Sequence, residues 1–251
     1  MPFSDEALAR LRADAADIIR RYPRSRSALL PLLHLVQSED GYVSEDGIKF
    51  CAETLGCTET EVVGVATFYT MYKHSPAGEY QVGVCTNTLC AIMGGDQIYA
   101  ELAQHLGADP HAHDAMSVDG KVGIERVECN AACDYAPVVM VNWEFFDNMT
   151  PEKAKKLVDD LRVGNKVTPT RGPDRLCTWK QAARILAGFG DGQATEGPSA
   201  GPASLVGLEL AKEHGWSAPA PKASAGGSGG SSPGAGKAPA PKAQPTDKDA
   251  K

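Results

Sequence analysis

Four cysteines form two short pairs in the middle of this 251-residue chain. Cys85 and Cys90 have four residues between them, and Cys129 and Cys133 have three. Thiolate sulfurs are ligands for soft metal centres, so four of them predict a zinc site or an iron–sulfur cluster. The spacing within the pairs fits both, and buried or redox cysteines are a third interpretation. The gap between the pairs is longer than a usual zinc-ribbon loop, and alanines flank the cysteines, which favours the bulkier iron–sulfur core.

The other three of the seven cysteines are expected to have no part in this site. An odd number of cysteines with no secretory signal favours metal ligation or burial over disulfides. Cys51 lies on the apolar face of a predicted helix that ends just before Cys57, so both are interpreted as buried. Cys177 is expected to be a free thiol.

The elements around the pairs alternate between strands and helices. Residues 80–84 predict a strand that runs into Cys85, and 122–127 predict a strand that leads to Cys129. Gly94 and Gly95 open a helix just after Cys90, where backbone N–H groups would favour negative charge. Strands at 137–141 and 144–146 and a helix that begins at Thr150-Pro151 follow. This order predicts an α/β sandwich on a small sheet.

The first third of the chain predicts a helical bundle. Residues 28–38 are apolar nearly all round, so this helix is expected at the centre of the bundle, with Gly41 at its end. Ser44 is a cap for the next helix, and Thr58 with Glu61 has the pattern of a capping box.

The last third of the chain has weaker signals. Helical patterns at 178–186 and 204–213 have no domain around them, and each is interpreted either as linker or as a helix that docks on a partner. Residues 217–251 contain no Val, Ile, Leu, Met, Phe, Tyr or Trp, so they cannot offset their ordering entropy by burial and are expected to be disordered.

Charge and apolar patterning exclude several classes of protein. The net charge is −7, and the tail after Trp216, with five Lys and two Asp, contributes +3, so the rest carries −10, which argues against nucleic acid as a partner. No apolar run approaches the roughly 20 residues of a membrane span, and no signal or transit peptide is recognisable. No G-x-G-x-x-G follows a strand. Residues 232–237 resemble a phosphate-binding loop, but Ser231 stands where that loop requires Gly and Ala238 stands where it requires a hydroxyl.

Three stretches together resemble one known family. They are Gly64-Val-Ala-Thr-Phe-Tyr-Thr-Met-Tyr72, Val84-Cys-Thr-Asn-Thr-Leu-Cys90 and Val127-Glu-Cys-Asn-Ala-Ala-Cys-Asp-Tyr-Ala-Pro137. In this order and separation they are similar to the thioredoxin-like [2Fe-2S] subunit of NADH:quinone oxidoreductase, respiratory complex I, which is called the E subunit in bacteria. The resemblance covers about residues 5 to 163. The pattern at 205–216 resembles an extension of actinobacterial members.

An α/β chain in four parts is therefore expected: a helical bundle (1–77), a thioredoxin-like [2Fe-2S] ferredoxin domain (78–164), an extended segment with short partner-docking helices (165–216) and a disordered low-complexity tail (217–251). The resemblance implies the first two parts and says nothing about the tail, which is expected from composition alone. It also implies that Cys85 and Cys90 bind one iron and that Cys129 and Cys133 bind the other. No general acid, base or nucleophile is expected, because the cluster supplies the chemistry.

The resemblance further implies two partners, a flavoprotein subunit that binds NADH and FMN and a multi-cluster iron–sulfur subunit. The cluster would exchange single electrons with the FMN. The location implied is cytoplasmic, peripheral on the cytoplasmic face of the plasma membrane through the complex. Two alternatives remain open: the same module in an NAD-linked hydrogenase or formate dehydrogenase, and a structural zinc-binding interaction module.

Overall fold

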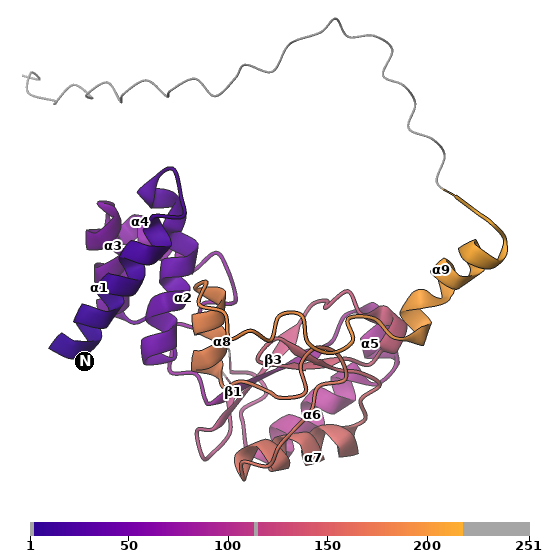
Figure 1. The fold of residues 1–251 in the computed structure, drawn as a ribbon. Helices are drawn as coiled ribbons and strands as arrows, with labels where there is room; N and C mark the ends of the chain where they lie inside the picture. The colour runs from indigo at the N-terminus through magenta and orange to yellow at the C-terminus, as the bar shows by residue number, and fades with distance from the viewer. Residues whose placement is uncertain (1–2, 113–114, 218–251) are drawn as a thin grey trace, which may run out of the picture. The chain divides into compact units, whose positions relative to one another are not determined.

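A computed structural model describes residues 3–112 and 115–217, and Figure 1 shows its course. Residues 1–208 form one compact unit, and a second unit begins at residue 209. The described part of the second unit is the end of the last helix and a turn in which the rings of His214 and Trp216 stack 4.9 Å apart. No helix in the described ranges is long and apolar enough to cross a membrane.

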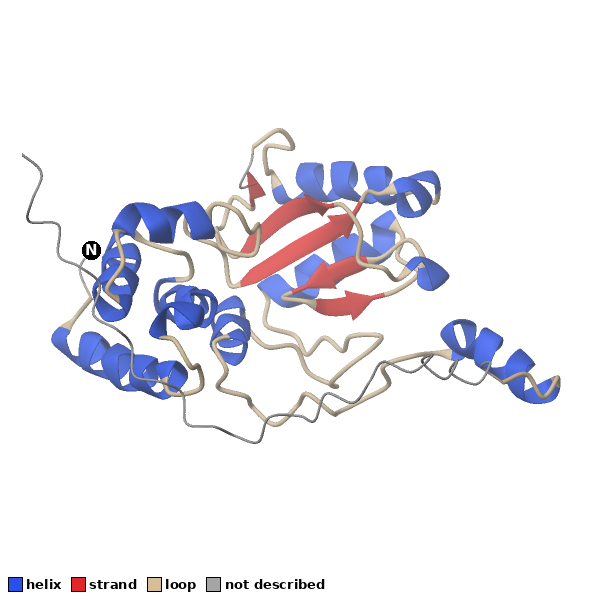
Figure 2. Cartoon of the chain, turned by 90° about the horizontal axis from the view of Figure 1, so that it is seen from above, coloured by secondary structure: helices blue, strands red, loops and turns tan. Residues whose placement is uncertain are grey.

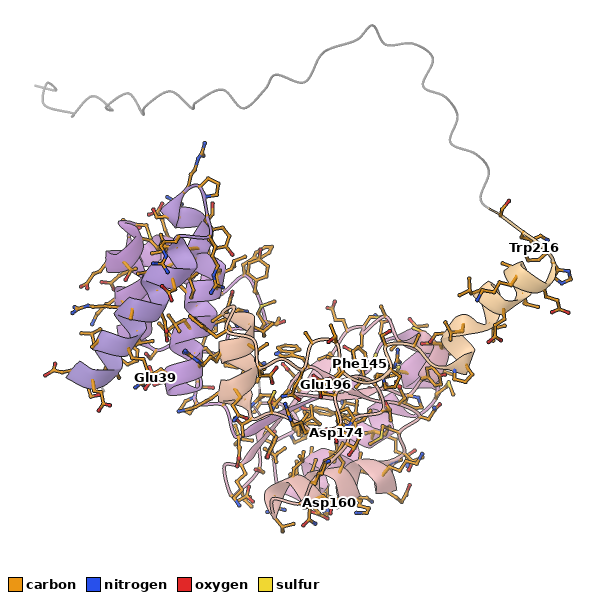
Figure 3. The ribbon with its side chains drawn as sticks, in the orientation of Figure 1. Glu39, Phe145, Asp160, Asp174, Glu196 and Trp216 are labelled. Atoms are coloured by element: carbon orange, nitrogen blue, oxygen red, sulfur yellow. The ribbon has the colours of Figure 1, made fainter. Side chains whose placement is uncertain are left out.

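The chain begins with the predicted helices. They are α1 (Asp5–Ile19), the 3-10 turn η1 (Ser25–Ala28), α2 (Leu29–Asp40), α3 (Glu45–Leu55) and α4 (Glu59–Ala66). Helix α2 ends at Gly41 with φ of 84°, Ser44 caps α3, and Thr58 with Glu61 forms the capping box of α4, all as predicted. The predicted central place of α2 is confirmed, because it contacts α1, α3 and α4. Glu39, labelled in Figure 3, lies near the end of α2 and pairs with Arg10 of α1 at 2.8 Å.

Helix α8 (Trp179–Leu186) is a further member of this bundle, although it comes more than 100 residues later in the sequence. It packs along α2 (Figure 1), where the Trp179 side chain is 1% exposed and its Nε1 donates to the Gly41 carbonyl oxygen at 2.8 Å. Arg184 pairs with Asp14 of α1 at 2.8 Å. The expectation that no domain surrounds this pattern is wrong, because α8 packs on α2. Docking of this helix on a partner stays a prediction.

The second layer of the molecule is a five-stranded sheet of order β2-β3-β1-β4-β5. Its strands are β1 (Tyr80–Cys85), β2 (Ala115–Met116), β3 (Val122–Val127), β4 (Val139–Val141) and β5 (Glu144–Phe146). β1 and β3 run parallel at its centre (Figure 2), and the other neighbours are antiparallel. Helices α6 (Gly95–Leu106) and α7 (Pro151–Arg162) lie side by side and share one apolar core with the sheet. The predicted α/β class is thereby confirmed.

The hairpin between β4 and β5 is the point where the later chain attaches to the sheet. Asn142 and Trp143 have φ of 48° and 77°, which forms a tight turn. The Asn142 Oδ1 accepts from the Gln81 N–H at 2.8 Å, and its Nδ2 donates to the Cys177 carbonyl oxygen at 2.8 Å. One buried side chain thus joins β1 to the segment that leads into α8.

Several details differ from the sequence-based expectations. Strand β4 begins at Val139 and not at 137, since Pro137 has no N–H for the ladder. The short elements α5 (Thr88–Ile92), β2 and η2 (Cys133–Tyr135) were not predicted. Helix α9 (Pro202–Glu213) matches the second late pattern. The boundaries of the four predicted parts remain predictions, and the predicted tail lies, apart from Ser217, outside the described residues.

Candidate metal centre

The two cysteine pairs come together because two parallel strands end at the same edge of the sheet. Cys85 is the last residue of β1 and is in register with Val127, the last residue of β3. Cys129 follows two residues later, in the loop after β3. Carboxyl ends of adjacent parallel strands are a common place for ligand sites in α/β folds.

The inner pair, Cys85 and Cys90, is buried. Each side chain is 3% exposed, and the two pack with Ala132, Ala136 and Val138 in a small apolar cluster of their own. The Cys85 thiol donates to the Glu128 carbonyl oxygen at 3.7 Å, and Cys85 lies close enough to contribute to the raised pKa of Cys90. Cys90 is presented by α5, so one thiol of the pair comes from a strand end and the other from a helix.

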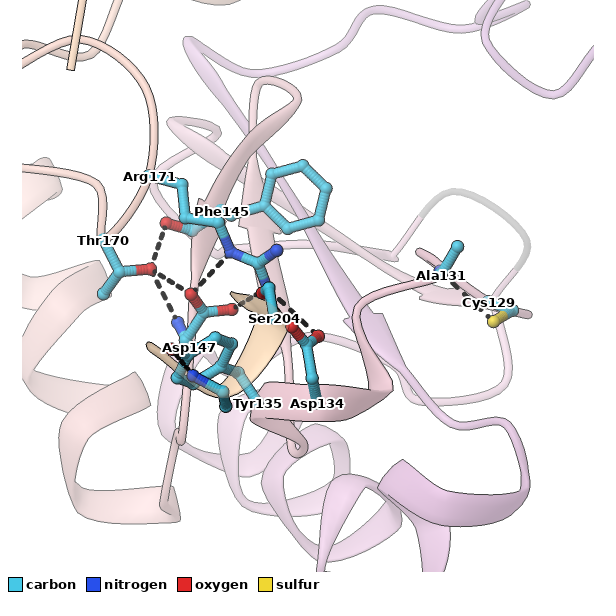
Figure 4. A network of polar contacts seen from close by, with 10 residues as sticks. Cys129, Ala131, Asp134, Tyr135, Phe145, Asp147, Thr170, Arg171 and Ser204 are labelled. Atoms are coloured by element: carbon cyan, nitrogen blue, oxygen red, sulfur yellow. Dashed lines mark hydrogen bonds and ion pairs between the residues drawn. The ribbon is translucent and has the colours of Figure 1, made fainter. Parts of the chain in front are cut away.

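The outer pair, Cys129 and Cys133, is exposed and lies outside regular strands. The two thiols lie close to each other, since Cys129 contributes to the raised pKa of Cys133. The Ala131 N–H donates to Cys129 Sγ at 3.3 Å (Figure 4), and Ala131 takes a φ of 51° to do so. This left-handed conformation is unfavourable for a residue with a Cβ, and such strain gathers at functional sites.

The two cysteine pairs lie close enough for thiols of one pair to affect the pKa of thiols of the other. Burial is the first cause that raises the pKa of Cys90, to about 11, and the neighbouring Cys85 and Cys133 add to it. Burial, and then Cys129, also raise the pKa of Cys133, with a further contribution from Cys85. The neighbouring thiols thus add to burial in disfavouring the thiolate forms of Cys90 and Cys133. Bound metal reverses this balance, because a cation holds coordinating thiols in the thiolate form.

Gly95 brings the start of α6 against the inner pair. A Cβ at this position would lie 2.4 Å from the Cys85 carbonyl oxygen and 2.9 Å from that of Cys90. Only glycine permits this approach, since both contacts are with backbone atoms. The predicted helix start after Cys90 is confirmed, with Gly94 at φ of 110° as its N-cap. An effect of this helix end on bound charge stays a prediction.

The donor set fits an anionic two-iron group. Among the described residues, no three His, Cys, Asp or Glu side chains surround a point suited to one metal ion. The thiols instead form two pairs, and each pair supplies two of the four thiolates that a [2Fe-2S] cluster requires. Asn130, next to Cys129, has a buried Nδ2 without a hydrogen-bond partner in the part of the chain that the structure describes, which leaves a donor for an anionic acceptor.

Other residues singled out in the sequence lie away from this site. Burial raises the pKa of Cys51 to about 12, and this thiol is part of the bundle core with Cys57 packed against it. Cys177 is half-buried beside the β4–β5 turn. Sequence reasoning missed Arg171, which packs on the turn that carries Cys133, since a lone arginine in a loop has no distinguishing pattern.

Comparison with known proteins decides the family. The family model of the thioredoxin-like [2Fe-2S] ferredoxin matches residues 15–162. The E subunit of the NADH-quinone oxidoreductase of Mycobacterium tuberculosis is 56% identical over 218 residues, which are 86% of this chain and 85% of that protein. The chain belongs to the thioredoxin-like [2Fe-2S] ferredoxin family, among its NADH-quinone oxidoreductase E subunits. The family resemblance found in the sequence is confirmed, and the chain is a subunit of an oxidoreductase complex.

More distant relatives cover less of the chain. NADH-quinone oxidoreductase subunit 2 of Thermus thermophilus is 34% identical over 158 residues, 62% of this chain and 86% of that protein. A solved NAD+-reducing [NiFe]-hydrogenase has a TM-score of 0.48 at 16% identity and covers 54% of this chain and 23% of its own. The family model ends at residue 162, whereas the mycobacterial match of 218 residues extends into the later part of the chain.

Proposed function

We propose that Cys85, Cys90, Cys129 and Cys133 hold a [2Fe-2S] cluster, with the inner pair on one iron and the outer pair on the other. The observation that carries this assignment is the placement of one buried and one exposed cysteine pair at the ends of adjacent parallel strands in a member of this family. A cluster bound there supplies one-electron redox chemistry.

The chain's own residues bind, orient and shield. The inner thiols are fixed by β1 and α5 and by the apolar residues around them, which keep water away from that side. The backbone of Val138 favours the thiolate of Cys90, and the Ala131 N–H donates to Cys129 Sγ. Hydrogen bonds to the sulfurs and the exposure of the outer pair are the means by which the protein sets a reduction potential.

The chain acts, in this proposal, as the subunit that exchanges single electrons with FMN on a neighbouring flavoprotein, next to a multi-cluster iron–sulfur subunit. The exposure of the outer pair supports this, since it lets a partner's cofactor approach the centre closely enough for electron transfer. Leu89, Ile92 and Met93 are exposed on and just after α5, and such an apolar patch beside Cys90 is typical of a docking surface. We place the subunit on the cytoplasmic face of the membrane through the complex.

Metal analysis and spectroscopy of the full-length chain test the proposal. Anaerobically purified protein is expected to contain iron and labile sulfide in equal amounts and to give a paramagnetic signal on reduction. Serine at each of the four cysteines should abolish or alter that signal, whereas Cys177→Ser, the matched control, should keep it. Zinc without sulfide, or an unaltered signal in all four variants, would refute the assignment.

A further inference from the structure

The chain after α7 returns to the metal centre. The family model ends at residue 162, and we name residues 165–204, which lie beyond it, the return segment. We infer that the return segment positions the outer cysteine pair and that Arg171 is its principal positioning residue. This inference rests on the ligand assignment proposed above, and goes beyond it by giving a cluster-related role to a part of the chain that the family domain does not include.

Arg171 joins the return segment to the edge strand of the sheet. It forms an isolated antiparallel bridge with Phe145 of β5. Its Nε and Nη2 donate to the two carboxylate oxygens of Asp147 at 2.8 and 2.7 Å, with side chains only 16% and 7% exposed (Figure 4). This two-pronged, largely buried pair is the geometry in which an arginine fixes a loop most firmly. Thr170 adds a hydrogen bond from its Oγ1 to Asp147 Oδ2 at 2.9 Å.

The same guanidinium contacts the turn that carries Cys133. Its Nη2 lies 3.9 Å from Asp134 Oδ1, and its carbon lies 5.2 Å from the centre of the Tyr135 ring. Asp134 and Tyr135 are the two residues after Cys133 and complete the η2 turn. One largely buried cation therefore links the sheet edge at Asp147 to the turn that carries Cys133.

A second contact of the return segment reaches the same two residues. The Ala203 N–H donates to the Tyr135 hydroxyl oxygen at 3.0 Å, and the Ser204 hydroxyl donates to Asp134 Oδ2 (Figure 4). The Tyr135 carbonyl oxygen also accepts from the Asn148 N–H at 2.9 Å. Asp134 and Tyr135 are thus each held from two places that are about 30 residues apart in the chain.

The outer pair needs such support because the core of the domain does not provide it. Cys129 and Cys133 are exposed and lie on irregular backbone, whereas the inner pair sits on β1 and α5. Outer contacts that orient the ligands hold a metal site in shape and slow its loss. The charge of Arg171 is balanced by Asp134 and Asp147, so its effect is geometric and does not add net positive charge to the centre.

Iron release from the full-length, cluster-loaded chain tests this role. Arg171→Met keeps the apolar stem of the side chain but removes the fork that binds Asp147. We expect iron to pass to a ferrous chelator on the order of tenfold faster than from the unmodified chain. Tyr135→Phe removes only the hydroxyl that accepts from Ala203 and should give a smaller increase in the same direction.

Arg184→Met is the matched control. Arg184 also belongs to the return segment, pairs with an aspartate at 2.8 Å and lies over an aromatic ring, but it faces the helical bundle. Its release rate should stay within about twofold of the unmodified chain, because a half-exposed pair there contributes little. The thermal unfolding temperature of each variant is measured as well. A general loss of stability would lower the unfolding temperature of Arg171→Met, whereas a specific effect on the centre would speed iron release without lowering it.

The outcomes are distinct. Equal release rates from Arg171→Met, Arg184→Met and the unmodified loaded chain would overturn the inference and leave the proposed function intact. An unmodified chain that never contains iron and sulfide would overturn the proposed function and the inference with it. If Arg171→Met does not fold, Tyr135→Phe decides, since it leaves the ion pair in place: a rate equal to that of the unmodified chain contradicts the role of the return segment.

Discussion

The inner and outer cysteine pairs have the same donor atoms but are positioned in different ways. Cys85 and Cys90 are 3% exposed, sit on a strand end and a helix, and have an apolar cluster around them. Cys129 and Cys133 are exposed and lie on a loop and a single 3-10 turn. The inner pair is fixed by local structure and burial, and the outer pair by polar contacts from elsewhere in the chain.

This difference separates binding from exchange within one centre. The inner side excludes water and leaves little freedom to its ligands. The outer side remains accessible to a partner but requires external support. A single site can in this way be firmly held and still exchange electrons across its surface.

The largest expected effect is the loss of iron when one of the four cysteines is replaced, and its size should differ between the two pairs. Cys85→Ser and Cys90→Ser should lose nearly all iron, because no water can replace a buried ligand. Cys129→Ser and Cys133→Ser should retain part of the iron with an altered spectrum, since solvent or the serine oxygen can complete the exposed side. Iron, sulfide and visible absorption of anaerobically purified protein measure this. Equal losses in all four variants would contradict the distinction between the pairs.

A methyl group at the start of α6 tests the close packing of the inner pair. Gly95→Ala should lower the free energy of unfolding by about 1–3 kcal/mol and reduce cluster content, because its Cβ would overlap the carbonyl oxygens of Cys85 and Cys90. Gly64→Ala is the control, since nothing lies within 4 Å of its Cβ in α4, and it should stabilise the chain by about 0.5–1 kcal/mol. Thermal unfolding and iron content serve as readouts, and a fully loaded, unperturbed Gly95→Ala would speak against close packing.

Strain in the outer loop predicts an effect of the opposite sign. Ala131 has φ of 51°, which glycine adopts without strain. Ala131→Gly should therefore raise the free energy of unfolding by about 0.5–1 kcal/mol, after the greater freedom of the unfolded chain is allowed for. Chemical denaturation of the loaded protein measures this. A loss of stability would show that the loop is not strained.

Thiol alkylation of the cluster-free chain gives the finest test of the two environments. Cys90 should react most slowly of the four, because it is buried and its pKa is raised to about 11, while the thiolate is the reactive form. Its rate should rise about tenfold per pH unit and level off near that pKa, since each unit below it removes most of the thiolate. Mass spectrometry of timed samples resolves the order of modification. Uniform rates in the folded chain, equal to those in denaturant, would contradict the order.

The sequence predicted most of the regular elements because their signals are local. Gly41, Ser44 and the Thr58–Glu61 capping box act within one helical turn, and the strands that end at Cys85 and before Cys129 follow from apolar patterning. The nearness of the two pairs followed from those strands once the family was recognised.

The parts that were not predicted depend on contacts between distant residues. Trp179 belongs to a helical pattern that was expected to have no domain around it. Only the folded chain shows that Trp179 covers α2 and donates a hydrogen bond to Gly41. Arg171 likewise acquires its role from Asp147 and Asp134, which no spacing rule connects to it. The φ of Ala131 and the short turn at Cys133 arise from loop geometry that propensities do not encode.

The late arrival of α8 in the bundle has a consequence for synthesis of the chain. Trp179 contacts Gly41 and Arg184 contacts Asp14, so the N-terminal helices expose one apolar side until more than 180 residues have been made. At about 5–20 residues per second, a ribosome leaves that side uncovered for several seconds or longer. Because such long-range closure is slow, we expect the nascent bundle to need a chaperone or an early-folding sheet domain to protect it until translation has passed α8.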